Sequence, residues 1–157
     1  MEVQTIGIIR SPFKEPTGTP IQASVAQDAE GIIEVYPQFV QGLKDLDGFD
    51  RIWLLYWFHQ AAPAKMIVTP FMDDKPRGLF ATRAPCRPNP IGISPVRLLK
   101  IEASCLHIAD IDVLDGTPLL DIKPYAPKFD HFAVGRVGWM EGAEHNRRLA
   151  DNRFSPQ

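Results

Sequence analysis

Hydrophobic residues recur along the chain in short runs separated by prolines and glycines. Residues 51–58 (RIWLLYWF) are apolar at nearly every position, which predicts a strand covered on both faces. Residues 106–114 alternate more clearly between apolar and polar positions, as a strand with one buried face does. Further short strands are predicted over residues 4–10, 32–36, 66–69, 79–82, 95–101 and 119–122. Strands this short and closely spaced favour a mainly β fold, a barrel or a sandwich.

Helical spacing appears at two places. Phe39, Leu43 and Leu46 lie at intervals of four and three residues. This spacing predicts a short amphipathic helix that ends at Gly48. Residues 142–151 (GAEHNRRLAD) hold good helix formers and predict a terminal helix or a frayed arm. Elsewhere the fifteen prolines exclude long helices, because proline lacks an amide donor and clashes with the preceding turn.

The chain has 157 residues, of which 45% are hydrophobic, and this length suits one compact domain with its own core. We assign residues 1–135 to that domain and residues 136–157 to a helical C-terminal tail. Two cysteines, Cys86 and Cys105, are too few for a disulfide framework, so a reducing cytoplasm is the expected location. No targeting segment or membrane span is expected, because the apolar runs are short.

The charge pattern limits how the chain can bind a polyanion. A net charge of −2 provides no long-range attraction for nucleic acid, so any such site must be local. Residues 75–100 contain no Asp or Glu. This segment carries the basic residues Lys75, Arg77, Arg83, Arg87, Arg97 and Lys100.

Residues 81–94 (ATRAPCRPNPIGIS) form the most distinctive segment. Its three prolines fix the backbone and extend the residues before them. A loop stiffened in this way loses little entropy on holding Arg83, Arg87 and Asn89 in one arrangement, which favours binding of an anion. The alternative is a rigid connector whose arginines are simply solvated.

Residues 114–125 (LDGTPLLDIKPY) place a tight turn at Asp115 and Gly116 between two apolar runs. The segment has two interpretations, a plain hairpin or part of a site. Asp121 and Lys123 alternate with apolar residues and so share a face near the turn. Asp115 and Asp121 are the strongest acidic candidates in the chain.

His59 and Gln60 follow the apolar run where a buried strand leaves the core, a position from which loops often present functional groups. The alternative is a histidine that serves only as a structural donor. No two metal ligands have a typical spacing beyond Cys105 and His107, so we expect no metal. Dinucleotide-binding, P-loop and nucleophile-elbow motifs are also missing from the sequence.

Four segments in order, IGIIRSPF, FHQ, GLFATRAPCRPNPIGIS and DGTPLLDIKPY, resemble the TsaA-like family, also called the YaeB or TrmO family. The match covers roughly residues 4–130. The resemblance implies a β-barrel methyltransferase that binds S-adenosylmethionine. It also implies a homodimer with the cofactor site near the interface. The implied reaction is methylation of the exocyclic N6 amine of threonylcarbamoyl-adenosine next to the tRNA anticodon.

Carried onto this sequence, the resemblance assigns cofactor contacts to Pro20, Ile21, Gln22, His59, Gln60, Arg83, Ile93, Leu114, Asp115, Gly116 and Thr117. It leaves Arg87, Asn89, Lys123 and Tyr125 to face RNA. Arg83 is expected to hold a carboxylate, and Asp115 or Thr117 ribose hydroxyls or the methionine amine. No catalytic base is identified, because the methyl donor carries its own leaving group.

One departure from the family concerns the C-terminal end, since many bacterial relatives carry an extra C-terminal domain. The tail offers His145, Arg147, Arg148 and Arg153, either as phosphate contacts or as a solvated helix face. Two other functions stay open. One is a non-catalytic module that binds S-adenosylmethionine or RNA, and the other is a methyltransferase for a different RNA or a small molecule.

Overall fold

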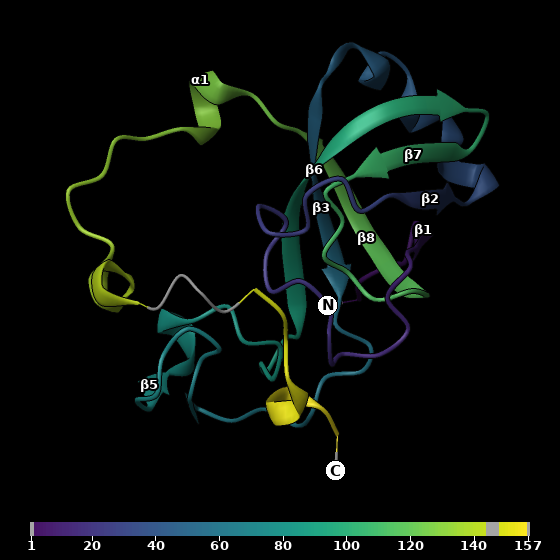
Figure 1. Ribbon diagram of the computed structural model, residues 1–157. Coiled ribbons are helices and arrows are strands. Elements are labelled where there is room, and N and C mark those ends of the chain that lie inside the picture. The colour runs from purple at the N-terminus through teal and green to yellow at the C-terminus, as the bar shows by residue number, and fades with distance from the viewer. Residues whose placement is uncertain (1, 144–147, 157) are drawn as a thin grey trace.

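The computed structural model describes residues 2–143 and 148–156. Six antiparallel strands close into a barrel (Figure 1): β1 (Gly7–Arg10), β2 (Gly31–Val35), β3 (Arg51–Trp57), β6 (Ile91–Glu102), β7 (Cys105–Ala109) and β8 (Thr117–Pro124). The order around the barrel is β1-β2-β7-β6-β3-β8, and β8 pairs back to β1. The prediction of a mainly β barrel is confirmed.

The remaining elements are short. A two-stranded sheet pairs β4 (Ile67–Val68) with β5 (Arg77–Gly78), beside the barrel in Figure 1. The helical turns are η1 (Pro37–Leu43), η2 (Leu46–Gly48), η3 (Leu79–Ala81), α1 (Pro127–Asp130), η4 (Gly138–Gly142) and η5 (Asn152–Phe154). No described helix has the length and apolar character that a membrane span requires.

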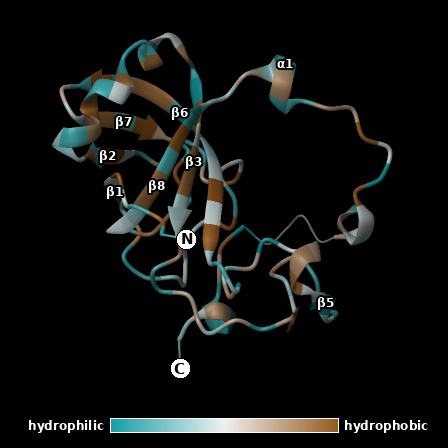
Figure 2. Cartoon of the chain, turned by 180° about the vertical axis from the view of Figure 1, so that it is seen from behind, coloured by the Kyte–Doolittle hydropathy of each residue, from teal (hydrophilic) through white to brown (hydrophobic). Residues whose placement is uncertain are grey.

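The core fills the inside of the barrel, where one face of each strand is buried. On β3 the buried residues Ile52, Leu54 and Tyr56 alternate with half-buried ones. Figure 2 shows the hydrophobic colour gathered on the barrel strands. The prediction that β3 is covered equally on both faces was therefore wrong, because closing the sheet into a barrel turns the second face outward.

Two predicted elements take a different form. The helix predicted to end at Gly48 is two 3₁₀ turns, η1 and η2, separated at Asp45, whose φ of 65° interrupts any regular helix. Residues 79–82 were predicted as a strand but form η3. Both segments still place apolar residues against a core, Phe39 in the first and Leu79 in the second.

Strand β6 begins earlier than predicted, inside the proline-rich segment. Gly92 lies opposite Tyr56 on β3, and a Cβ at Gly92 would lie 2.2 Å from Cε2 of that ring. Only glycine leaves room for the aromatic side chain at this crossing. The second half of the proline-rich segment is therefore a barrel strand, and the first half is the loop that leads into it.

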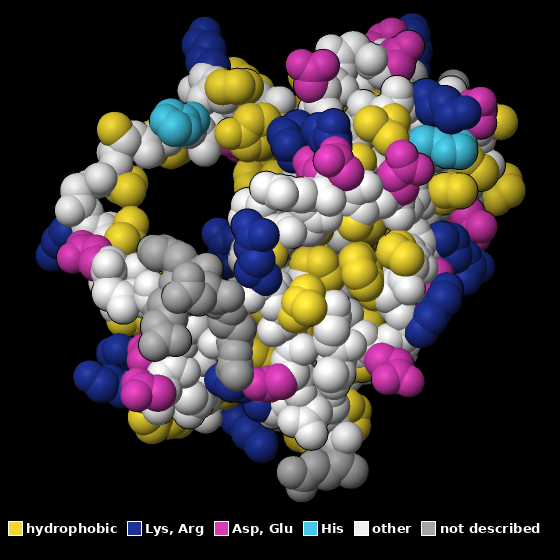
Figure 3. Space-filling view, in the orientation of Figure 1, with side chains coloured by type: hydrophobic (Ala, Val, Ile, Leu, Met, Phe, Trp, Pro, Cys, Tyr) yellow, Lys and Arg dark blue, Asp and Glu magenta, His cyan; other side chains and the backbone are white. Residues whose placement is uncertain are grey.

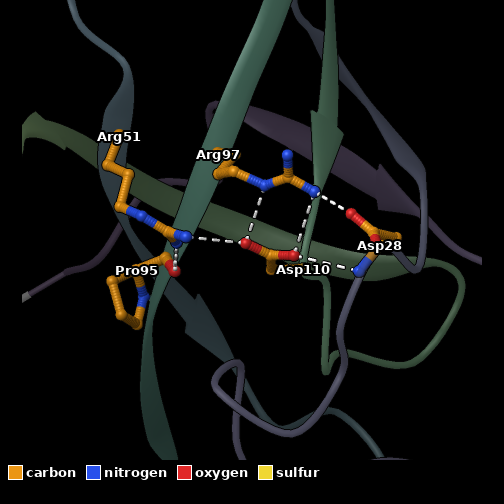
Figure 4. Close-up of polar contacts among 5 residues, drawn as sticks. All are labelled: Asp28, Arg51, Pro95, Arg97 and Asp110. Atoms are coloured by element: carbon orange, nitrogen blue, oxygen red, sulfur yellow. Dashed lines mark hydrogen bonds and ion pairs between the residues drawn. The ribbon is translucent and has the colours of Figure 1, made fainter.

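Strand β7 ends at Ala109, earlier than predicted, because Asp110 has a φ of 65° and turns the chain. The Asp110 carboxylate accepts from Arg51 Nη2 at 2.8 Å and Arg97 Nε at 3.0 Å, and Arg97 also pairs with Asp28 (Figure 4). The next residues leave the sheet, so β7 pairs with β2 and β6 while β8 pairs with β1 and β3. The hairpin interpretation of residues 114–125 is therefore wrong.

The tail returns to the N-terminal loop. Of the helix predicted over residues 142–151, residues 144–147 lie outside the described part, and residues 148–151 are not helical. Leu149 forms an antiparallel bridge with Pro20. The Gly18 amide donates to the Ala150 carbonyl at 2.9 Å, and the Ala150 amide donates to Thr19 at 2.8 Å. The tail thus packs beside the loop that follows β1.

Candidate functional site

Five segments far apart in the sequence meet around a pocket of about 340 Å³ at one end of the barrel. Its wall includes residues from 16–22, 56–61, 82–93, 112–117 and 150–154. They meet because β3 ends here while β6 and β8 begin here, as antiparallel neighbours must. The stretch 150–154 is a contribution that sequence patterns did not indicate, since only the folded chain brings it beside the first loop.

Most residues that the resemblance assigns to the cofactor line this pocket. They are Pro20, Ile21, Gln22, His59, Gln60, Arg83, Ile93, Leu114 and Thr117. Asp115 and Gly116 lie outside the lining and form the turn behind it, where Gly116 has a φ of 75°. The Asp115 carboxylate accepts from the Ser11 amide at 3.1 Å and pairs with Lys14 at 2.8 Å. Asp115 therefore fixes the turn to the first loop.

One wall of the pocket is aromatic and aliphatic. The rings of Tyr56 and Phe58 meet edge to face with centroids 5.3 Å apart, and Ile91 and Ile93 flank them. Phe154 of the tail packs against Phe71 at 4.9 Å on another side. Apolar surfaces with a few convergent polar groups are typical of small-molecule sites.

His59 and Arg83 supply polar groups at the rim. Burial lowers the pKa of His59, although the charge of Asp115 opposes this, so the imidazole is neutral at neutral pH. Its Nδ1 lies 3.3 Å from the Thr117 hydroxyl. Arg83 is exposed and donates from Nη1 to the side-chain oxygen of Gln22 at 2.7 Å. This bond joins the proline-rich loop to the loop after β1 across the pocket.

Asp112 also lines the pocket, and sequence reasoning missed it as a site residue. Ser94 donates from its hydroxyl to Oδ1 of Asp112 at 2.6 Å. The Tyr56 hydroxyl lies 3.0 Å from the same serine oxygen. The strand predicted over residues 106–114 had included Asp112. The turn at Asp110 moves it to the pocket instead.

The residues expected to face RNA do not gather in one place. Arg87 lines the pocket, and its Nη1 donates to the carbonyls of Thr82 and Ala84 at 3.0 and 3.3 Å. Asn89 is exposed but outside the lining. Lys123 pairs with Asp121 at 2.7 Å, and Tyr125 packs on Trp53 at 5.6 Å. Both lie at the end of β8 far from the pocket.

The basic segment 75–100 is less free of partners than its composition indicates. Arg77 pairs with Asp73 at 2.7 Å, Arg97 with Asp110 at 3.0 Å and Lys100 with Glu102 at 2.8 Å. Within the described part of the chain, Arg83 and Arg87 form no ion pair with a carboxylate. Two of the charges of this segment that pair with no described carboxylate, Arg83 and Arg87, therefore lie at the pocket, whereas Lys75 lies away from it.

The tail residues proposed for phosphate binding divide in two. Arg148 is exposed, whereas Arg153 pairs with Asp151 at 2.7 Å and donates to the Pro70 carbonyl at 2.8 Å. His145 and Arg147 lie outside the described residues. Arg153 thus helps to hold the tail in place.

No cluster of three His, Cys, Asp or Glu side chains suited to a metal ion occurs in residues 2–143 and 148–156.

Comparison with known proteins gives consistent matches. Residues 8–131 match the model of the tRNA-methyltransferase O N-terminal domain. A probable S-adenosyl-L-methionine-binding protein of Pyrococcus abyssi is 55% identical over 95% of this chain and 82% of its own length. The tRNA (adenine(37)-N6)-methyltransferase of Escherichia coli strain K12 is 36% identical over 90% of this chain.

A crystal structure of TrmO from Pseudomonas aeruginosa superposes with a TM-score of 0.74 and 44% sequence identity, over 88% of this chain. The chain spans 62% of the length of that structure and 65% of the E. coli relative. The match therefore covers the barrel and its pocket. The rest of those longer proteins is not matched by this chain.

Proposed function

The chain belongs to the tRNA-methyltransferase O family, and from that premise we propose that it methylates tRNA with S-adenosylmethionine. The acceptor in this proposal is the N6 amine of threonylcarbamoyl-adenosine next to the anticodon. The observation that carries the proposal is the convergence of separate motif segments on one pocket. A volume of about 340 Å³ lies within the range of small-molecule sites.

The residues of the pocket fit S-adenosylmethionine. The apolar wall around Tyr56 and Phe58 suits the adenine ring, because aromatic side chains favour offset or edge contacts with another ring. The exposed guanidinium of Arg83 suits the carboxylate of the methionine part, which it can meet with two parallel hydrogen bonds. The Thr117 hydroxyl, beside neutral His59, suits a ribose hydroxyl.

When bound, S-adenosylmethionine would supply an electrophilic methyl group to the acceptor nitrogen, with its sulfur as the leaving group and the proton of the nitrogen lost to solvent. The role of the protein is to align the acceptor with the donor and to exclude competing water. The loop bond between Arg83 and Gln22 holds two walls of the pocket in a fixed arrangement before binding.

In this proposal the positive charge that contacts tRNA comes from residues at the pocket, chiefly Arg87. Arg87 anchors its own loop through Nη1, while its Nε and Nη2 donate no hydrogen bond to any described protein group. These two nitrogens suit a phosphate. Phe80, which is 76% exposed, lies under the Arg87 guanidinium at 5.7 Å, and an exposed ring at such a place suits base stacking.

We also propose that two copies of the chain associate. The arm, residues 126–137, stands off the barrel, and Figure 3 shows an opening between them. Phe129 and Phe132 on the arm are 70% and 74% exposed, and Val134 is 68% exposed. A monomer seldom leaves a series of large apolar residues in water. Ile91 and Ile93 beside the pocket are also exposed, which supports an interface near the cofactor site.

The deciding experiment incubates the purified chain with labelled S-adenosylmethionine and tRNA that carries threonylcarbamoyl-adenosine. Nucleoside analysis of the product is expected to show label in that nucleoside, and tRNA without the modification serves as the control. Label in a different nucleoside would favour another acceptor. Cofactor binding without any transfer of label would favour the non-catalytic module.

A further inference from the structure

Three hydrogen-bonded polar side chains lead from the core to the pocket floor, where Tyr56 and Asp112 line it and Ser94 lies behind them. Ser94 is completely buried and Tyr56 is 4% exposed, whereas Asp112 is half-buried and lines the pocket. The serine hydroxyl donates to Asp112, so the tyrosine hydroxyl is the donor in the contact between Tyr56 and Ser94. The chain of donors therefore points from the core toward the carboxylate of Asp112.

This arrangement leaves a carboxylate in the pocket without a cation bound to it. Burial raises the pKa of Asp112 to about 6, although the Ser94 hydroxyl, the backbone amides of Asp112 and Ala23 and, least of all, the charge of Arg83 oppose the increase. The group is still mostly ionised at neutral pH. Among the described residues no Lys, Arg or His forms an ion pair with it. A half-buried carboxylate of this kind is unfavourable unless a positive group approaches it.

Arg83 lines the same pocket, and its charge reaches Asp112 although no ion pair joins them. Within the lining, Arg83 and Asp112 are thus a cation and an anion that interact without being paired. Amino acids carry a carboxylate and an ammonium on the same carbon. A group of that kind between Arg83 and Asp112 would meet a partner of opposite charge on each side.

We propose that the carboxylate of Asp112 binds the α-ammonium of the amino-acid end of the cofactor, while Arg83 binds its carboxylate. This inference rests on the cofactor of the proposed function and adds a residue that the resemblance did not assign. Asp115, the acid expected from the sequence, is engaged by Lys14 and Ser11 outside the lining. Asp151 also lines the pocket but pairs with Arg153 at 2.7 Å. Asp112 is therefore the lining carboxylate that pairs with no described cation.

The depth of Asp112 favours this role over proton removal from the acceptor. Its partners Ser94 and Tyr56 are buried, and Arg83 is exposed. A tRNA nucleotide that enters from the exposed side would meet a cofactor bound between that side and the floor before it reached Asp112. The Asp112 carboxylate thus contacts the cofactor rather than the acceptor amine.

The test compares three ligands by calorimetry: S-adenosylhomocysteine, its analogue without the amino group, and 5′-methylthioadenosine, which lacks the whole amino-acid end. Wild-type protein is expected to bind the analogue about ten- to a hundredfold more weakly than S-adenosylhomocysteine, as loss of a charged hydrogen bond predicts. In Asp112→Asn this difference should fall to within about threefold, and 5′-methylthioadenosine should bind both proteins alike.

Glu102→Gln is the matched control, because it removes one negative charge from an exposed residue outside the pocket and should keep the wild-type preference. An equal preference for the amino group in wild type and Asp112→Asn would overturn the inference and leave the cofactor assignment intact. Equal binding of the two larger ligands by wild type would overturn it without any variant. If wild type binds none of the three nucleosides, the proposed cofactor itself is wrong, and this inference with it.

Discussion

Gly92 shows how a single missing side chain shapes the pocket. The Tyr56 ring lies over its Cα, and a methyl group there would lie 2.2 Å from Cε2 of that ring and 2.9 Å from Phe58. Gly92→Ala is expected to destabilise the fold by about 1–3 kcal/mol, the usual cost of overpacking a core. It should also weaken cofactor binding, because the displaced rings form the apolar wall.

Gly78→Ala is the control for this change. Its φ is −60°, and no atom lies within 4 Å of the added carbon. Thermal unfolding and calorimetry with S-adenosylhomocysteine measure both effects. Wild-type affinity and stability in Gly92→Ala would contradict the packing argument.

Asp112 should make the free protein less stable than it would be without the charge. The pKa of Asp112 in the folded protein, about 6, lies above the ordinary value of an aspartate. Protonation of Asp112 therefore stabilises the fold in acid, and this contribution is lost as the pH rises from about 4 through 6. Asp112→Asn is therefore expected to be more stable than wild type at pH 7, on the order of 1–3 kcal/mol.

Chemical denaturation at pH 4 and pH 7 tests this expectation. The difference between the two proteins should shrink at pH 4, where both side chains are neutral. A less stable Asp112→Asn at pH 7 would instead indicate that the carboxylate is a structural acceptor. A residue that lowers stability and improves binding is typical of functional sites.

Sequence patterns identified residues near the pocket better than they assigned roles to them. Arg83, His59 and Thr117 all lie at the pocket. Each belongs to a short continuous motif that can be recognised in the sequence without the fold. Asp115 was predicted as an acidic site residue, whereas Asp112 was not. Their placement depends on the positive φ at Asp110, which shifts the alternation after it and which no residue pattern specifies.

At the scale of elements, the turn at Asp110 connects the barrel to the pocket. Burial would raise the pKa of its carboxylate, but hydrogen bonds from Arg97, the Asp28 amide and Arg51 hold it below the ordinary value. The stability that it provides is thus present above about pH 4 and is lost as the pH falls further. Asp110→Asn is expected to melt several degrees lower than wild type at pH 7.

Asparagine tolerates a positive φ nearly as well as aspartate, so this substitution tests the charge and not the backbone. Circular dichroism melts at pH 7 and pH 3 provide the measurement, and the deficit should be smaller at pH 3. Asp130→Asn on α1 is a suitable control, since Asp130 is exposed. An unchanged melting temperature in Asp110→Asn would show that the cluster contributes nothing to stability.

Elements were predictable where local composition decides their form. Strands β2, β3 and β8 lie close to their predicted positions, because each contains a run of large apolar residues bounded by residues that favour turns. The segments around η1 and η3 were assigned to the wrong class. Their apolar residues suit a helix or a strand. Packing selects the 3₁₀ turn, against the barrel core for η1 and against the small cluster around Val68 and Cys86 for η3.

The barrel and the arm define the molecule as a whole. If the apolar arm pairs with a second copy, Phe129→Ser combined with Phe132→Ser should convert a dimer to a monomer, because it removes two large exposed rings from the interface. Analytical ultracentrifugation measures the change. Val3→Ser is the control, since Val3 is 53% exposed but lies far from the arm in sequence.

A wild-type protein that sediments as a monomer at micromolar concentration would contradict the proposed association. A double variant that remains dimeric would move the interface elsewhere. Sequence patterns alone did not indicate the arm, because residues 126–137 resemble an ordinary loop. Their separation from the barrel is visible only in three dimensions.

The bridge between Pro20 and Leu149 has a consequence for synthesis of the protein. The pocket wall needs Thr19 and Ile21 from the first loop, and it also needs Ala150 and Phe154. During translation the barrel strands leave the ribosome before residue 150 does. A nascent chain can therefore close its barrel while the pocket still lacks one wall, so cofactor capture has to wait until residues 150–154 have been made.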